Sequence, residues 1–138
     1  MGNSKIRKPV VAGQFYPASA QALTKQIQAL LAGDLSAKKD SGGCDCLACM
    51  LPHAGYIYSG SVAAQTVSQI KIKDKIILLG PNHTGYGAQF SMVKEGLWQT
   101  PLGEVPIESR LAGEILRGCK YLEEDNLAHA YEHSLEVE

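Results

Sequence analysis

Two short apolar runs, each followed by a loop that contains glycine, proline and histidine, constrain the fold of this chain most strongly. Residues 47–51 lead to His53, and residues 76–79 lead to His83. Short apolar runs closed by glycine or proline are typical of strands buried on both faces, as in a parallel sheet covered by helices. Between the runs, residues 61–70 carry apolar side chains at helical spacing. The sequence therefore predicts a β-α-β unit.

This unit would bring the two histidines to one edge of the sheet. A right-handed crossover makes the strands parallel, so both histidine loops would leave from the carboxyl edge, where open α/β sheets bind their ligands. Pro52 and Pro81 restrict the loop backbones, and Gly55 and Gly80 allow close approaches that a side chain would obstruct. A lone loop histidine is usually an ordinary solvated residue, but two at equivalent positions favour a shared site.

The composition indicates a globular protein without a strong charge bias. Of 138 residues, 45% are hydrophobic, and 13 basic against 14 acidic residues give a formal net charge of -1. Basic residues are not clustered with aromatic ones, so we expect no nucleic-acid partner. No apolar run is long enough for a membrane span, and the first residues lack the apolar core of a signal peptide. We therefore expect one domain, located in the cytoplasm and not bound to a membrane.

Local patterns predict further elements on both sides of the β-α-β unit. Ser19 is placed to cap a helix that Gly33 ends. Residues 89–93 alternate weakly, as in a short strand, and residues 98–107 fit a hairpin or an edge strand. Residues 108–117 have the spacing of an amphipathic helix.

The cysteines are predicted to be reduced thiols because no export signal is present. Cys44, Cys46 and Cys49 resemble a set of zinc ligands. In an extended segment, however, alternation directs Cys44 and Cys46 to one face and Cys49 to the other, so they cannot close on one tetrahedral ion. We predict that these residues and Cys119 form neither a disulfide framework nor a zinc cage.

A third cluster offers an alternative zinc site. The segment from His129 to His133 matches the H-x-x-E-H spacing, in which two histidines one helical turn apart bind zinc and the glutamate activates water. That site needs a third ligand well downstream, where only Glu136 and Glu138 remain. It also leaves the histidines after the two apolar runs unexplained. We expect His133 to fix a loop and His129 to be exposed.

Five motifs, in their order and spacing, resemble those of the Memo family. They are AGQFYP at 12–17, PHAGYIYSG at 52–60, GPNH at 80–83, WQTPLG at 98–103 and EHSLE at 132–136. The resemblance covers nearly the whole chain. It implies a fold similar to the class III extradiol dioxygenases, which is an α/β/α arrangement of a mostly parallel sheet with flanking helices and a metal pocket at the strand ends.

The resemblance also implies the residues of this pocket. The family's pocket histidines map onto His53 and His83 as ligands of Fe(II) or Cu. The residues expected to line or support the pocket are Tyr56, Asn82, Glu132 and His133. The third ligand is expected to be absent from this chain, because the family's Asp-x-x-His-type pair and cysteine lie in a later half of the domain. Residues 1–138 are thus expected to be the N-terminal part of a single truncated domain.

Two functions from different classes remain open. One is a non-haem iron or copper redox enzyme of the dioxygenase type, since two imidazoles and one anionic ligand with open positions let Fe(II) bind oxygen and substrate together. The other is a non-catalytic adaptor that binds a peptide or small ligand in the same pocket. Family analogy suggests AMMECR1-like and radical-SAM partners. For the 138-residue chain alone, we expect self-association, weak metal binding and little or no activity.

Overall fold

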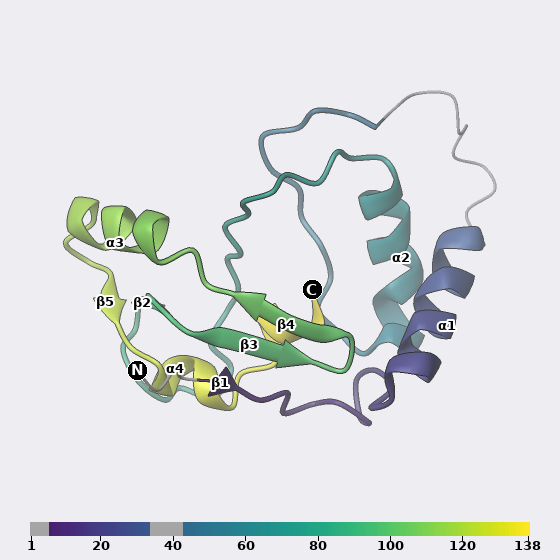
Figure 1. Ribbon diagram of the computed structural model, residues 1–138, viewed down its shortest axis with the longest axis horizontal. Helices are drawn as coiled ribbons and strands as arrows, with labels where there is room; N and C mark the ends of the chain where they lie inside the picture. Colours follow the sequence, from purple (N-terminus) through teal and green to yellow (C-terminus); the bar gives the residue numbers. More distant parts are fainter. Residues whose placement is uncertain (1–5, 34–42) are drawn as a thin grey trace. The chain divides into compact units, whose positions relative to one another are not determined.

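The computed structural model describes residues 6–33 and 43–138, and the chain clusters into two compact units (Figure 1). One unit consists of residues 6–10 with Leu79–Glu136, and the other consists of the described part of Val11–Leu78 with Val137–Glu138. The first unit contains all the strands of the described residues, and the second contains two helices of 13 residues each. The chain is therefore a mixed α/β protein, as the sequence predicts.

The sequence predicts both helices of the second unit. Helix α1 (Ala20–Ala32) begins after Ser19, whose Oγ accepts a hydrogen bond from the Ala22 N–H at 3.2 Å. This bond satisfies one of the backbone donors that a helix leaves unpaired at its N-terminus. Gly33 is the C-cap residue, and helix α2 spans Tyr56–Ser68. The predicted cap and the helix after it are confirmed. The helix predicted at residues 61–70 is also present, but it begins five residues earlier, at Tyr56, and ends at Ser68.

Helices α1 and α2 pack against each other, and a glycine allows their close approach (Figure 1). A Cβ added to Gly60 of α2 would lie 2.7 Å from Leu30 Cδ1 of α1, which is closer than carbon atoms pack. Leu23 of α1 and Ala64 of α2 are buried. These contacts form the core of the second unit.

An isolated parallel bridge lies outside both predicted strands of the β-α-β unit. Cys44 and Ile70 form this bridge, in which the Cys44 N–H donates to the Gln69 carbonyl at 2.6 Å. The Lys71 N–H donates in turn to the Cys44 carbonyl at 3.0 Å. Cys44 precedes the first apolar run and Ile70 ends the predicted helix, so neither predicted strand takes part in this pairing.

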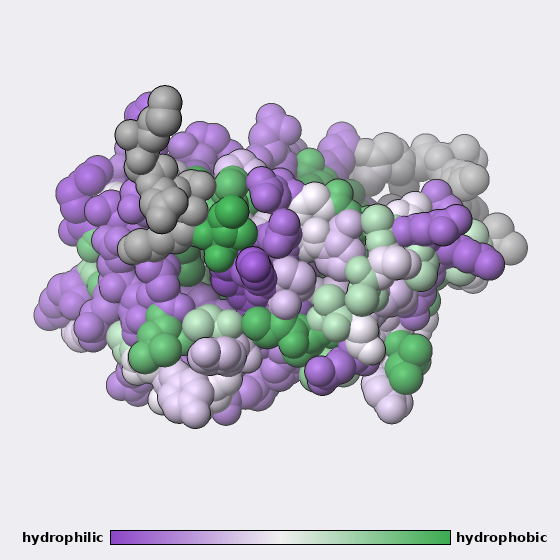
Figure 2. Space-filling view, turned by 60° about the horizontal axis from the view of Figure 1, so that its bottom comes forward, coloured by the Kyte–Doolittle hydropathy of each residue, from purple (hydrophilic) through white to green (hydrophobic). Residues whose placement is uncertain are grey.

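Beyond the bridge, the two apolar runs do not become strands. Residues 47–51 and 76–79 lack a hydrogen-bonded ladder, and Met50 and Leu79 are 91% and 86% exposed. Figure 2 shows hydrophobic residues between hydrophilic ones on one face of the molecule. The prediction of two buried strands is wrong here, because a strand of that kind needs neighbours on both edges and covering layers on both faces. The described residues provide neither along these runs.

The first unit contains a three-stranded sheet. Strands β3 (Leu97–Thr100) and β4 (Gly103–Pro106) form an antiparallel hairpin, and β1 (Ile6–Arg7) pairs in parallel with β3. The two-residue turn places Gly103 at a φ of +141°, a conformation that residues with a Cβ rarely adopt. Thr100 Oγ1 donates to the Gly103 carbonyl at 3.1 Å across the turn. The predicted hairpin is confirmed.

A second pair of strands and a helix complete the larger elements of this unit. Strand β2 (Ser91–Met92) pairs in parallel with β5 (Glu123–Glu124). Helix α3 (Ser109–Gly118) confirms the predicted amphipathic helix, and Glu108 caps it by accepting the Leu111 N–H at 2.7 Å. Within residues 6–33 and 43–138, each parallel ladder is only two residues long. No helix in this part of the chain combines the length and the apolar character of a membrane span.

Arg7 ties strand β1 to the last part of the unit. Its guanidinium forms an ion pair with Glu136 and lies 4.5 Å from the centre of the Trp98 ring. It also donates hydrogen bonds to the carbonyl oxygens of His129 at 3.2 Å and Glu132 at 2.5 Å. The Glu136 side chain is 1% exposed and also accepts the Val10 N–H. Paired charges with several hydrogen bonds compensate for their removal from water.

Candidate functional site

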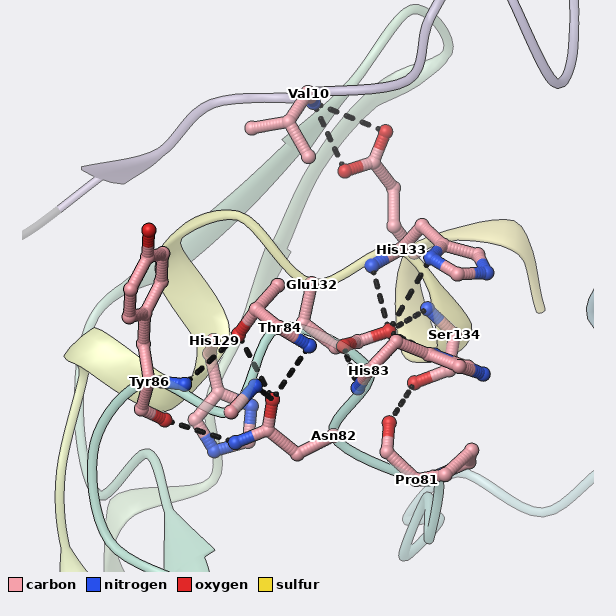
Figure 3. A network of polar contacts seen from close by, with 12 residues as sticks. Val10, Pro81, Asn82, His83, Thr84, Tyr86, His129, Glu132, His133 and Ser134 are labelled. Atoms are coloured by element: carbon pink, nitrogen blue, oxygen red, sulfur yellow. Dashed lines mark hydrogen bonds and ion pairs between the residues drawn. The ribbon is translucent and has the colours of Figure 1, made fainter.

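A buried carboxylate holds His83 at two points (Figure 3). Glu132 Oε2 accepts the backbone N–H of His83 at 2.5 Å, and Glu132 Oε1 lies 2.8 Å from Nδ1 of the same histidine. The Glu132 side chain is 5% exposed, whereas that of His83 is 44% exposed. Because an ionised carboxylate only accepts hydrogen bonds, Nδ1 is the donor, and a neutral His83 therefore has its lone pair on Nε2.

Two further backbone groups donate to the same carboxylate. The N–H groups of His133 and Ser134 each donate to Glu132 Oε1 at 2.9 Å. Burial alone raises the pKa of Glu132, but the hydrogen bonds from the His83 ring, Ser134, His83 and His133 outweigh this effect and lower the pKa to about 2. Glu132 is therefore ionised at neutral pH.

The two segments that carry these residues lie directly against each other. Ser134 Oγ donates to the Pro81 carbonyl at 2.9 Å. A Cβ added to Gly80 would lie 2.7 Å from Leu135 Cδ2 and 2.8 Å from Ser134 Oγ. The close approach predicted at Gly80 is confirmed, and it brings the loop of His83 onto the start of the short helix α5 (Ser134–Val137).

His133 stacks on His83. The ring centres are 4.5 Å apart and the rings are inclined by 24°, while His133 Nδ1 lies 3.4 Å from Glu132 Oε1. One ligand nitrogen of each ring lies within 4.8 Å of the other. The lone pair of an imidazole nitrogen lies in the plane of the ring. Because the two rings are stacked and nearly parallel, their lone pairs do not point to one common ion unless a ring turns. In this conformation His133 supports the His83 ring from its face.

Asn82 shapes the loop that follows His83. Its Oδ1 accepts hydrogen bonds from the N–H groups of Thr84 and Gly85, each at 3.1 Å, and from Thr84 Oγ1 at 2.8 Å. Its Nδ2 donates to the Tyr86 carbonyl at 2.8 Å (Figure 3). The amide of Asn82 therefore stabilises a turn, as asparagine commonly does.

His129 belongs to a different set of contacts, which excludes the zinc-peptidase geometry. The short helix α4 (Leu127–Ala130) ends before His133, so the two histidines do not lie one turn apart on a helix. His129 Nε2 lies 3.2 Å from Ser91 Oγ, and its ring meets that of Trp98 edge-on at 6.1 Å. The expectation that His129 is exposed is wrong, because it is half-buried. Burial is the main cause that lowers its pKa.

His53 and Tyr56 lie in the second unit. Tyr56 is the first residue of α2, and its hydroxyl donates to the Val137 carbonyl at 3.1 Å. Burial raises the pKa of Tyr56. Burial also raises the pKa of Glu138, and the charge of His53 acts in the opposite direction. His53 and His83 thus belong to different units, and a site shared between them stays a prediction.

The cysteines have free thiols in the structure. Cys44 and Cys49 are exposed, whereas Cys46 and Cys119 are half-buried. The prediction that they hold no zinc stays a prediction.

Sequence comparisons relate this arrangement to known proteins. Residues 7–138 match the family of Memo-like proteins, which is nearly the whole chain. The chain belongs to the Memo family. MEMO1 family proteins of Methanopyrus kandleri and Aquifex aeolicus are each 43% identical to it, over 96% and 97% of the chain respectively. A MEMO1 family protein of Pyrobaculum arsenaticum is 44% identical over 97% of the chain.

The chain spans about half the length of these Memo family relatives, with 49%, 48% and 50% of the three proteins covered.

Two residues that support Glu132 and the stacked rings of His83 and His133 were not predicted from the sequence. Ser134 lies inside a motif of the Memo resemblance, so its position was a usable signal. Arg7 lies 129 positions from Glu136, and no local pattern indicates their pairing.

Proposed function

We propose that this Memo family chain contributes His53 and His83 to a non-haem metal site of the redox type, with Fe(II) or Cu as the metal. The observation that carries the proposal is the hydrogen bond from His83 Nδ1 to buried Glu132. Metal-binding histidines commonly donate their second ring nitrogen to a carboxylate, which orients the ring and makes the other nitrogen a better ligand. Imidazole nitrogen suits both metals, so the donors present fit this group.

The residues of the chain have separate tasks in this proposal. A bound redox metal with open positions supplies the binding of oxygen or substrate. Glu132 keeps a proton on His83 Nδ1, and His133 covers one face of the His83 ring. Asn82 holds the turn after His83. These contacts position a ligand and do not themselves perform a redox step.

The proposal also covers the wider fold, the ligand and the protein partners. We infer a dioxygenase-like arrangement similar to the class III extradiol enzymes for the family domain, with a small molecule or peptide as ligand. AMMECR1-like and radical-SAM proteins are proposed partners by family analogy. Support comes from membership of the Memo family and from the stacked rings of His83 and His133 beside Glu132. Because the chain spans about half of each relative, the catalytic role is proposed for the longer proteins.

Metal titration of single histidine variants tests the proposal. Fe(II), added without oxygen, and Cu(II) are each titrated into the chain, and bound metal is measured by elemental analysis after gel filtration. His83→Ala and His53→Ala are expected to lower metal affinity at least about tenfold, as losses around metal sites typically do. His129→Ala is the control, because His129 contacts Ser91 and Trp98 and lies outside the proposed ligand set. Unchanged affinity in His83→Ala contradicts the proposal.

Oxygen uptake separates the two functional classes. The Methanopyrus kandleri relative, about half of which aligns with this chain, is loaded with Fe(II) and given a catechol. Oxygen consumption that depends on the residue equivalent to His83 supports the redox enzyme. Stoichiometric metal without oxygen consumption supports a non-catalytic binding protein.

A further inference from the structure

The contacts of Glu132 do more than join two segments of the chain. A carboxylate that only joined them needs no contact beyond the backbone N–H groups of His83, His133 and Ser134. Glu132 also reaches the His83 ring, so that its two oxygens bind the backbone nitrogen and the ring nitrogen of one residue. This double contact fixes both the position and the rotation of the imidazole.

Glu136 provides a comparison within the same segment. Its carboxylate is as deeply buried as that of Glu132, with side-chain exposures of 1% and 5%. It binds the Arg7 guanidinium and the Val10 N–H, and these contacts anchor the segment to the N-terminal part of the unit. The two buried glutamates therefore share an anchoring role, and Glu132 is distinguished by its contacts to the rings of His83 and His133.

The His133 ring restricts the remaining motion of His83. A histidine ring turned over about its Cβ–Cγ bond exchanges the places of its two edges and moves Nδ1 away from its partner. Stacking at 4.5 Å places the His133 ring against the face of His83, where it hinders that rotation. The carboxylate and the stacked ring together select one orientation.

We propose that Glu132 is a positioning residue that keeps His83 in the Nδ1–H tautomer and directs Nε2 toward the metal. The inference deepens the proposed function and rests on it for the identity of His83 as a ligand. The tautomer itself is a property of the metal-free chain, because it is set by the hydrogen bond that the other ring nitrogen makes.

Nitrogen NMR of the metal-free chain tests the tautomer directly. Long-range ¹H–¹⁵N spectra of the chain labelled in histidine, assigned with His83→Ala, are expected to show the proton of neutral His83 on Nδ1 and the lone pair on Nε2. Glu132→Ala is expected to shift His83 toward the Nε2–H form that imidazole favours in water. Glu136→Ala is the matched control, since it removes a similarly buried carboxylate four residues away, which binds Arg7 and the Val10 N–H.

The outcomes separate this inference from the proposed function. An Nε2–H tautomer in the wild-type chain overturns the inference without any variant, and so does a folded Glu132→Ala variant with unchanged His83 nitrogen shifts. In Fe(II) titrations, Glu132→Ala is expected to weaken binding by about 10- to 100-fold and Glu136→Ala by much less. A wild-type chain with the Nδ1–H tautomer but no metal affinity contradicts the proposed function and still supports control of the tautomer by Glu132.

Discussion

The Glu132→Gln variant is expected to unfold more easily than the wild-type chain at neutral pH and equally easily in strong acid. Glutamine has nearly the shape of glutamate but resembles its protonated, neutral form. The ionised carboxylate accepts three backbone N–H groups and the His83 ring N–H, and a neutral amide accepts them less strongly. One amide nitrogen would also face an N–H donor.

The size of the effect follows from the pKa of Glu132, which folding lowers from 4.5 to about 2. Each pKa unit corresponds to about 1.4 kcal/mol, so the ionised carboxylate stabilises the folded chain by about 3 kcal/mol. Because the folded-state pKa is the lower one, this stabilisation is fully present above pH 4.5. It is lost as the pH falls from about 4.5 toward 2.

Urea unfolding followed by the fluorescence of Trp98 measures this difference. Trp98 is the only tryptophan of the chain and lies in the same compact unit as Glu132. The wild type and Glu132→Gln are compared at pH 7, 5, 4 and 3, and their unfolding free energies are expected to converge with decreasing pH. Glu114→Gln is the control, since it removes only an exposed pair with Arg110 and is expected to change stability by less than about 0.5 kcal/mol.

Two results would refute this reasoning. One is a difference between wild type and Glu132→Gln below about 1 kcal/mol at pH 7. The other is a difference of about 3 kcal/mol that stays constant from pH 7 to pH 3, because the ionisation of Glu132 would then not be its source.

The remaining predictions concern packing and the buried ion pair, both measured by the same unfolding assay. Gly80→Ala is expected to destabilise the chain by about 1–3 kcal/mol, because the new Cβ would overlap Leu135 and Ser134. Gly118→Ala is the control and should cause no loss of stability, because no atom lies within 4 Å of its new Cβ. An equal loss of stability in both variants would argue against the overlap. Arg7→Met is expected to destabilise the chain by about 3–5 kcal/mol, because buried Glu136 loses its cationic partner. Arg110→Met removes an exposed partner of Glu114 and should change stability by less than about 0.5 kcal/mol, and equal effects of the two arginine variants would show that burial does not matter here.

Much of the local structure could be predicted from the sequence, because the forces that set it act over a few residues. Ser19 caps α1, apolar spacing places α2 and α3, and a two-residue turn that ends at Gly103 closes the hairpin. The five motifs also identified the family correctly. A cap, a turn or a helical face is determined by the residues that form it.

The apolar runs show where this reasoning ends. Residues 47–51 and 76–79 have the composition of buried strands, yet they remain exposed beyond the bridge between Cys44 and Ile70. The apolar composition of these runs indicates only that their side chains favour burial, and it does not determine which segments would cover them. A strand forms when other segments supply hydrogen-bond partners and a covering layer, and these are long-range contacts.

The candidate site divides in the same way. By itself, the sequence determined that His83 follows a restricted glycine and proline loop and that Glu132 and His133 are neighbours. Only the tertiary structure decided that Glu132, 49 positions from His83, binds both its backbone and its ring, and that Arg7 meets Glu136 across 129 positions. The physical reason is that a buried charge is stable only with partners that neutralise and hydrogen-bond it, and the folded path of the chain selects these partners.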